Sequence, residues 1–279
     1  MEYRTITTLL TEADDLGHVI DNAAAVARRA GAHLEVLCLG LDRTRPDFYY
    51  AGASAVLVQD NMAQAHETAA ALEQAVRQRL NGADFNWSVD ALVTPMIMLN
   101  GLVAHRTRFS DLVVLPKPYG EGRGHEHEAI VEAALFNGGV PVLVLPDGEP
   151  MPADIATAIV AWNDSAEALR ATRFALPFLK AAQNTCITII DPPTHGPDRS
   201  DPGGALSQWL ARHGVRAEVS VLARTLPRVS DILNRQVMDK DAQMIVMGAY
   251  GHSRFREAIM GGATRHMLEV AQVPVLMMH

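Results

Sequence analysis

The chain repeats one pattern of strands and helices along its length. The segment Val140-Pro-Val-Leu-Val-Leu-Pro146 recurs as Val273-Pro-Val-Leu-Met-Met-His279, and each copy follows a helix-like segment. Further upstream, residues 111–120 match residues 242–251, each an apolar run that leads to a Tyr-Gly pair. Such self-similarity predicts two copies of one structural unit, so each half must build the same kind of core.

Within each half, short apolar runs alternate with segments of helical periodicity. In the first half, apolar stripes at helical spacing span residues 16–30 and 65–80, and residues 87–93 alternate as a strand. The second half opens at residues 157–162 with an apolar run that resembles residues 5–10. This alternation predicts an α/β fold with two tandem, doubly wound units, each a five-stranded parallel sheet with helices on both faces.

A proline-rich segment separates the halves. Residues 146–152 read Pro-Asp-Gly-Glu-Pro-Met-Pro, which forms neither a helix nor a strand. The sequence therefore predicts one domain over residues 1–147 and a second over residues 154–279.

Composition excludes several classes of protein. Of the 279 residues, 48% are apolar, enough for substantial cores, and a net charge of −8 argues against nonspecific nucleic-acid binding. We find no apolar run near the roughly 18 residues of a spanning helix, and no signal peptide, so the expected location is the cytoplasm, with no membrane partner. Cys38 and Cys186 lie in strand-like runs, which predicts buried, reduced thiols.

A glycine-rich motif follows the apolar run 244–247 in the second half. Glycine lets the backbone approach a bulky anion, and the amides that open a helix attract phosphate. A turn of this kind after a strand, with a second glycine pair opening a helix, could cradle a polyphosphate. The residues of the motif are Gly248, Gly251, Gly261, Gly262, Ala263 and Thr264.

This motif, together with the closing Val-Pro-Val-Leu strand, resembles the universal stress protein family. The resemblance implies that each unit is a flavodoxin-like α/β sandwich. Some members of the family bind ATP between the first and fourth strands and others do not. In the second unit, the resemblance places Gly248 near the ribose and gives Gly251, Gly261, Gly262 and Ala263 the role of offering amides to phosphates, with a hydroxyl from Thr264.

Two positions depart from the family's pattern. Asn163 stands at the end of the first strand of the second unit, where the family commonly has Asp and the adenine is expected. Asn can hydrogen-bond a base or a ribose but carries no charge. Gly262 stands where the family often has Ser or Thr, and the lost hydroxyl removes a hydrogen bond to phosphate of roughly 1.5–3 kcal/mol.

The first half lacks the glycine motif. Counting back from the shared closing strand, Glu128 and Ala129 stand at the positions of Gly261 and Gly262. A carboxylate at a helix N-terminus repels phosphate and already satisfies the helix dipole, so the first unit is predicted to be a degenerate, structural partner. By resemblance, the closing strands of the two units, Val140–Leu145 and Val273–Met278, should pair.

Three functions remain open. The first is a non-catalytic stress-response module that binds ATP, with Mg²⁺, in the second unit and is read by an unidentified protein partner, with homodimers as a further assembly. The second is a scaffold without a ligand, in which the glycines serve packing alone. The third is a weak ATP hydrolase or phosphotransferase, for which Asp164 is the candidate base. No metal site is expected, because His125-Glu-His-Glu128 reads as a solvated helix start.

Overall fold

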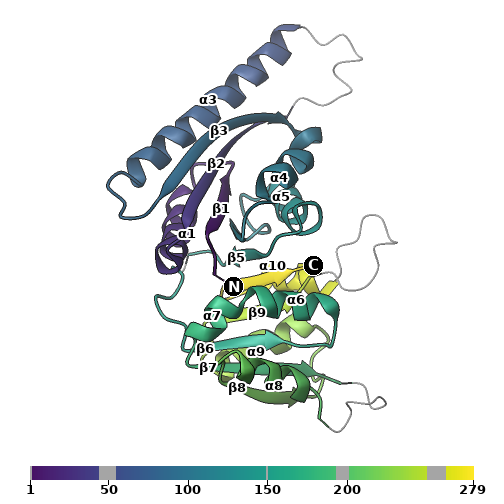
Figure 1. Ribbon diagram of the computed structural model, residues 1–279. Helices are drawn as coiled ribbons and strands as arrows, with labels where there is room; N and C mark the ends of the chain where they lie inside the picture. Colours follow the sequence, from purple (N-terminus) through teal and green to yellow (C-terminus); the bar gives the residue numbers. More distant parts are fainter. Residues whose placement is uncertain (1, 44–54, 149, 193–200, 250–261) are drawn as a thin grey trace. The chain divides into compact units, whose positions relative to one another are not determined.

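The computed structural model in Figure 1 describes residues 2–43, 55–148, 150–192, 201–249 and 262–279. The chain forms two compact units. The first unit comprises Tyr3–Pro116 and Gly122–Val140. The second unit comprises Pro141–His279 together with Lys117–Glu121 and Glu2.

The first unit contains a parallel sheet in the order β3-β2-β1-β4. Helices α1 and α3 contact each other on one face of the sheet, and α4, α5 and the π-helical turn η2 contact one another on the other face (Figure 1). The strands are β1 (Thr5–Leu10), β2 (His33–Asp42), β3 (Trp87–Pro95) and β4 (Leu112–Pro116). The helices are α1 (Leu16–Ala30), α3 (Ala55–Arg79), η1 (Met96–Met98), α4 (Leu99–Thr107), α5 (His125–Glu132) and η2 (Ala133–Gly138).

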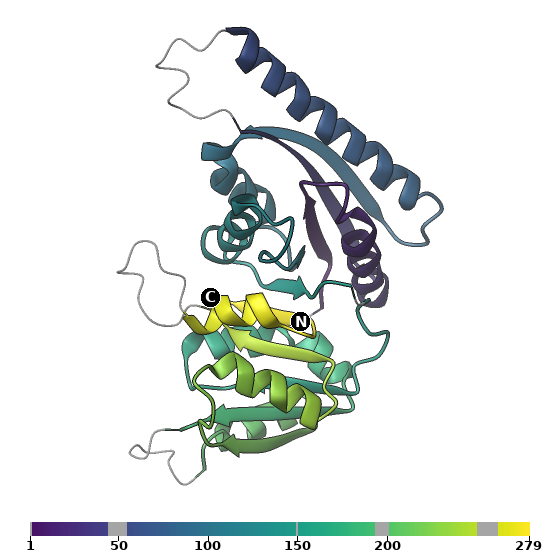
Figure 2. The same ribbon diagram turned by 180° about the vertical axis from the view of Figure 1, so that it is seen from behind.

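The second unit has the strand order β5-β10-β9-β6-β7-β8. Helices α6, α7 and α8 lie in front of its sheet in Figure 1, and α9 and α10 cover the face turned to the viewer in Figure 2. The strands are β5 (Val142–Leu145), β6 (Thr157–Ala161), β7 (Asn184–Ile190), β8 (Ala217–Leu222), β9 (Met244–Gly248) and β10 (Val275–Met278). The helices are α6 (Ala166–Phe174), α7 (Leu176–Ala181), α8 (Gly204–Arg212), α9 (Val229–Asp239) and α10 (Gly262–Val270).

The predicted pairing of the two closing strands is confirmed. β5 and β10 run antiparallel, with Val144 opposite Val275 and Val142 opposite Met277, whereas the other pairs of this sheet are parallel. β5 closes the first repeat in the sequence, yet it lies in the second compact unit. The repeat and the compact unit therefore divide the chain at different places.

The apolar residues that the sequence patterns predict to be internal are buried in the cores of the two units. Every residue of β4 is buried, as expected of a central parallel strand covered on both faces. On α1, the predicted stripe is buried at Leu16, Val19, Ile20 and Ala23. Cys38 and Cys186 are both free and buried. The prediction of an α/β fold with flavodoxin-like units is confirmed.

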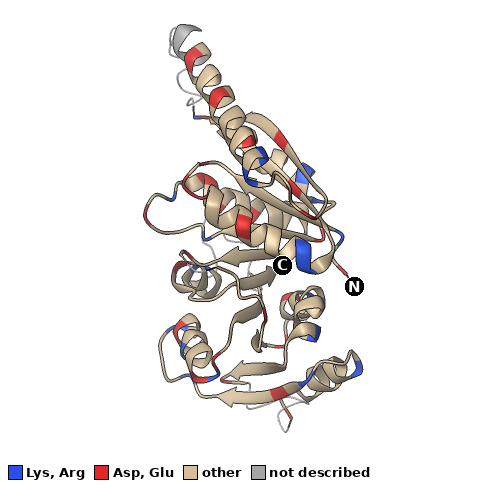
Figure 3. Cartoon of the chain, turned by 90° about the vertical axis from the view of Figure 1, so that its left-hand side faces the viewer, with Lys and Arg blue, Asp and Glu red and all other residues tan. Residues whose placement is uncertain are grey.

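Charges are distributed over both units. In Figure 3, blue and red segments are interspersed along the helices and loops. Within the part of the chain that the structure describes, no helix combines the length and hydropathy needed to cross a membrane.

Candidate functional site

The second unit has a topological switch point between β6 and β9. These neighbouring strands are parallel, with Ala161 level with Met247, and the chain leaves them toward opposite edges of the sheet. Open α/β sheets bind ligands outside the carboxyl ends of the strands at such a point. Asn163 follows β6, Gly248 ends β9, and α10 starts on this side because it connects β9 to β10.

A tight turn follows β6. The backbone N–H of Ser165 donates to Asn163 Oδ1 at 3.3 Å, and Asp164 between them has a φ of 60°, a left-handed conformation that Asp tolerates better than most residues. Ser165 Oγ then accepts the N–H of Ala168 at 3.1 Å, so Ser165 is the N-cap of α6. Asn163 is exposed, and its amide N–H groups can donate to a ligand.

Gly248 has a structural reason to be glycine. A Cβ at this position would lie 2.6 Å from the backbone nitrogen of Ala168 and 2.8 Å from the carbonyl carbon of Glu167. The first turn of α6 therefore packs directly on the end of β9. This contact supports the packing interpretation at Gly248 without any ligand.

The described part of the opening of α10 carries small residues and no acidic side chain. Gly262 and Ala263 are exposed, Thr264 is buried, and the first turn carries no acidic side chain. A Cβ on Gly262 would meet nothing closer than the ring of His266 at 3.7 Å, so packing does not require glycine here. Gly251 and Gly261, the other predicted phosphate-binding residues, lie outside the described residues.

His279 lies at the same edge of the second unit's sheet, and the sequence analysis did not identify this residue. It follows β10, and its Nδ1 lies 3.0 Å from the carbonyl oxygen of Ala249, just past the end of β9. The matching position in the first repeat is Pro146, so the internal repeat alone gave no signal for this residue.

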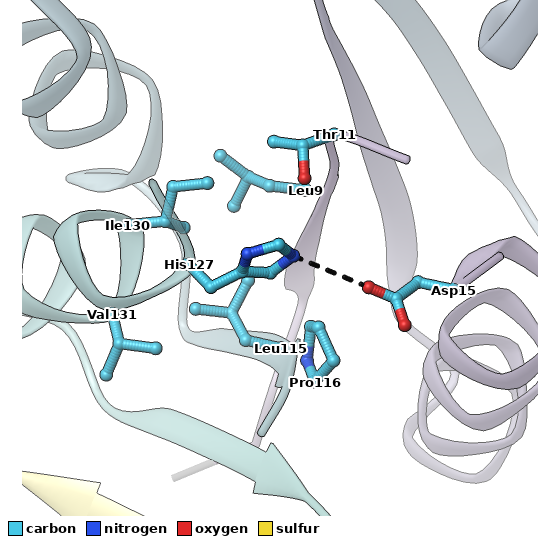
Figure 4. A pocket seen from close by; sticks show the side chains of 8 residues that line it. All are labelled: Leu9, Thr11, Asp15, Leu115, Pro116, His127, Ile130 and Val131. Atoms are coloured by element: carbon cyan, nitrogen blue, oxygen red, sulfur yellow. Dashed lines mark ion pairs between the residues drawn. The ribbon is translucent and has the colours of Figure 1, made fainter. Parts of the chain in front are cut away.

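The switch point of the first unit lies between β1 and β4 and holds a pocket. Its volume is about 10 Å³, the space that about one water molecule needs. Figure 4 shows the rings and side chains that converge there from β1, β4, α5 and the turn before α1. The lining residues are Leu9, Thr11, Asp15, Leu115, Pro116, His127, Ile130 and Val131.

Two ion pairs close this edge of the first unit. Arg123 pairs with Asp15, and Arg43, the residue after β2, pairs with Glu126 in the first turn of α5. The side chains of Glu126 and His127 are only 7% and 4% exposed. The prediction of a solvated helix start at residues 125–128 is therefore wrong, because partners distant in the sequence bury its second and third residues.

The predicted carboxylate, Glu128, lies in the first turn of α5, and Glu126 places a second carboxylate there. Glu126 folds back over Gly124, the N-cap of α5, so that a Cβ on Gly124 would overlap the carboxylate. Glu128, the residue predicted from the repeat, is only partly buried.

The electrostatics favour a charged Asp15. Burial by itself would raise the pKa of Asp15, but the adjacent His127 and Arg123 outweigh burial and hold this pKa below its usual value. Among the described residues, no group of three or more His, Cys, Asp or Glu side chains is arranged to hold a metal ion.

Comparison with known proteins agrees with this fold. The model of the universal stress protein family matches residues 155–279, which correspond closely to the second repeat. The second half of the chain is thus similar to the universal stress protein family. No curated protein matches the chain.

Solved structures resemble the whole chain. A universal stress protein from Archaeoglobus fulgidus DSM 4304 is 15% identical with a TM-score of 0.75, over 99% of this chain and 96% of that one. A protein from Pseudomonas aeruginosa UCBPP-PA14, assigned to the same family, is 14% identical with a TM-score of 0.60, over 99% of this chain and 93% of that one. At such identities the likeness shows the fold alone.

Proposed function

We propose that the chain is a stress-response module that binds ATP, with Mg²⁺, at the switch point of the second unit. The occupied state favours one conformation, which a protein partner reads. The module is non-catalytic in this proposal. The observation that carries the proposal is the first turn of α10, which has no acidic side chain and in which Gly262 and Ala263 are exposed.

The chemistry of this opening suits a polyphosphate. The first backbone N–H groups of a helix have no partners within the helix, and the dipole adds partial positive charge there. Small side chains at Gly262 and Ala263 leave room for phosphate oxygens to reach these groups. By contrast, α5 of the first unit carries Glu126 and Glu128 in its first turn, which would repel the same ligand.

The direct test is to denature freshly purified protein and identify any released nucleotide by chromatography. ATP near one equivalent per chain supports the proposal. If no nucleotide is released, and saturating Mg·ATP does not raise the melting temperature, the proposal fails. A ligand at about 100 times its Kd should stabilise its unit by roughly 2.7 kcal/mol, which such a melting experiment detects easily.

Gly262→Asp separates a binding site from a scaffold. The space around Gly262 is open, and a carboxylate in the first turn of a helix is stabilising by about 0.3–1 kcal/mol. The fold should therefore survive, while phosphate is repelled. Gly262→Asn is the matched control with the same size and no charge. Equal ATP binding by Gly262→Asp and wild type would favour the scaffold.

Asp164 supports a second candidate, a weak ATP hydrolase. Its carboxylate is exposed at the end of β6, on a backbone with a left-handed φ of 60°, and strained backbone gathers at active sites. Asp164→Asn keeps the backbone conformation and removes the base. Slow ATP hydrolysis that is unchanged in this variant would eliminate Asp164 as the base.

A further inference from the structure

Strand β8 forms an open edge of the sheet in the second unit (Figure 1). The carbonyl oxygens of Arg216 and Leu222 accept N–H groups from β7 and from the residue after it, so even-numbered residues direct their backbone toward β7. Because successive residues of a strand alternate, the N–H and C=O groups of Ala217, Val219 and Val221 point outward. Within the part of the chain that the structure describes, these outward groups form no hydrogen bond.

The corresponding edge strand of the first unit, β3, is protected. The N–H of Leu34 in β2 donates to the carbonyl oxygen of Asn86, so the odd-numbered residues of β3 face outward. Among these, Pro95 has no N–H, and a guanidinium nitrogen of Arg77 lies 3.5 Å from the carbonyl oxygen of Val89. Proline and long cationic side chains are devices that keep edge strands from pairing. β8 contains neither a proline nor a cationic residue.

The open edge also carries exposed apolar side chains. Val219 and Val221 lie on the same face of β8 and are 40% and 51% exposed. Helix α9 covers the other face, where Lys240 pairs with Glu218 at 2.8 Å. An apolar row beside unpaired backbone groups is the arrangement to which a further strand adds, since the backbone supplies hydrogen bonds and the side chains supply buried area.

We propose that the edge of β8 pairs with the same edge of a second copy of this chain, antiparallel and with a two-fold axis at Val221. The outward N–H and C=O groups of Val221 then meet those of the other Val221. A two-fold interface uses the same patch on both copies, so a single self-complementary edge is sufficient. The closing strands are not available for this pairing, because β5 already pairs with β10 within the chain. The inference does not depend on nucleotide binding by the second unit.

Charge selects both the second copy and the register. The proposed axis places Glu218 opposite Arg224 of the second copy, and opposite charges that face each other across two strands are stabilising. An axis at Ser220 would instead place Arg216 opposite Arg224, which is destabilising because the charges are alike. An axis at Val219 would leave Glu218 without a cation on the second copy. The sequence of β8 is therefore complementary to itself in one antiparallel register.

Sedimentation velocity over a range of protein concentrations tests the assembly. One pair of edge strands buries less than the roughly 800 Å² per partner of a standard interface, so a Kd of about 1–100 μM is expected. Val221→Lys brings two like charges together at the axis and should raise the Kd at least about tenfold. Because Val221 is half-exposed, the fold should survive. Met238→Lys is the matched control, since it adds the same charge at another exposed apolar residue, on α9, and should associate like wild type.

Two results of this experiment would refute the proposal. The first is a wild-type chain that stays monomeric at roughly 100 μM, which would leave the edge to an extended segment of a different protein. The second is a dimer that Val221→Lys does not weaken, which would place the interface on another surface.

Cysteine cross-linking tests the register without relying on Val221→Lys. In Val221→Cys the two thiols meet across the axis, at the roughly 5.5 Å Cα separation that a disulfide can span. Val219→Cys is the control on the same face, because its own copy lies about 14 Å further along the strand. The native Cys38 and Cys186 are buried and do not compete. Under mild oxidation, Val221→Cys should form covalent dimers and Val219→Cys should not, and any other pattern overturns the proposed pairing.

Discussion

The two glycines of one motif should respond oppositely to the same substitution. In Gly248→Ala, the new methyl would lie 2.6 Å from the backbone nitrogen of Ala168 and 2.9 Å from Glu167 Cβ. Because backbone cannot move aside as a flexible side chain does, the start of α6 must shift. Overpacking of this kind costs about 1–3 kcal/mol. Ser165 Oγ accepts the N–H of the same Ala168. If the shift also breaks this cap, the free energy of unfolding falls by about 1 kcal/mol more.

Gly262→Ala is the matched control. Its methyl would meet nothing nearer than 3.7 Å, and replacing glycine by alanine at a compatible position stabilises by about 0.4–1 kcal/mol. We therefore expect Gly248→Ala to lower, and Gly262→Ala to hold or raise, the free energy of unfolding of the second unit.

Urea denaturation followed by tryptophan fluorescence measures this difference. In a Trp87→Phe background, the remaining tryptophans, Trp162 and Trp209, both report on the second unit. The experiment is done without nucleotide, so that a lost ligand cannot explain the result. If Gly248→Ala has the same midpoint as its parent, the close approach of α6 is not the reason for glycine at this position.

Three further outcomes follow from the structure. The lowered pKa of Asp15 means that its charge stabilises the fold fully above the ordinary Asp value of about 3.9, and that this contribution is lost as the pH falls through the lower folded-state pKa. Asp15→Asn should therefore be less stable than wild type at pH 7, and the difference in urea midpoints should shrink as the pH is lowered below the ordinary Asp value. Ser165→Ala should lower the free energy of unfolding, measured by chemical denaturation, by about 1 kcal/mol. Ser165→Asp should retain most of the stability, because Asp also caps helices. An equal loss in both variants would contradict the role of Ser165 as a cap. Burial raises the pKa of the Cys38 thiol to about 12. A disulfide reagent at pH 8 should therefore modify Cys38 only as fast as the protein unfolds. In a Cys186→Ala variant, where Cys38 is the remaining cysteine, rapid labelling would contradict this expectation.

Much of the fold followed from periodicity. Parallel strands covered on both faces read as continuous apolar runs, and β4 and β9 were visible for this reason. The repeated closing strand also identified the β5–β10 pair, since the resemblance to a known family supplied the pairing rule. These signals are local, or they compare one segment of sequence with another.

The chemistry at the first switch point could not be predicted in that way. Glu126 and His127 looked solvated because nothing near them in the sequence buries them. Their environment depends on Arg43, 83 residues before Glu126, and on Asp15, 108 residues before Arg123. Gly248 was ambiguous for a similar reason. A glycine permits the approach of a ligand or of another backbone, and only the fold shows that α6 comes this close.

The antiparallel pairing of β5 with β10 bears on how such a chain could be divided. A gene cut at the repeat boundary would leave residues 154–279 without β5, and β10 would present a bare edge of buried valine, leucine and methionine. Bare edges of this kind recruit other strands. A fragment that begins at residue 141 would include β5, which pairs with the edge of β10. The sequence repeat therefore ends after β5, whereas the compact unit that contains β10 also includes β5.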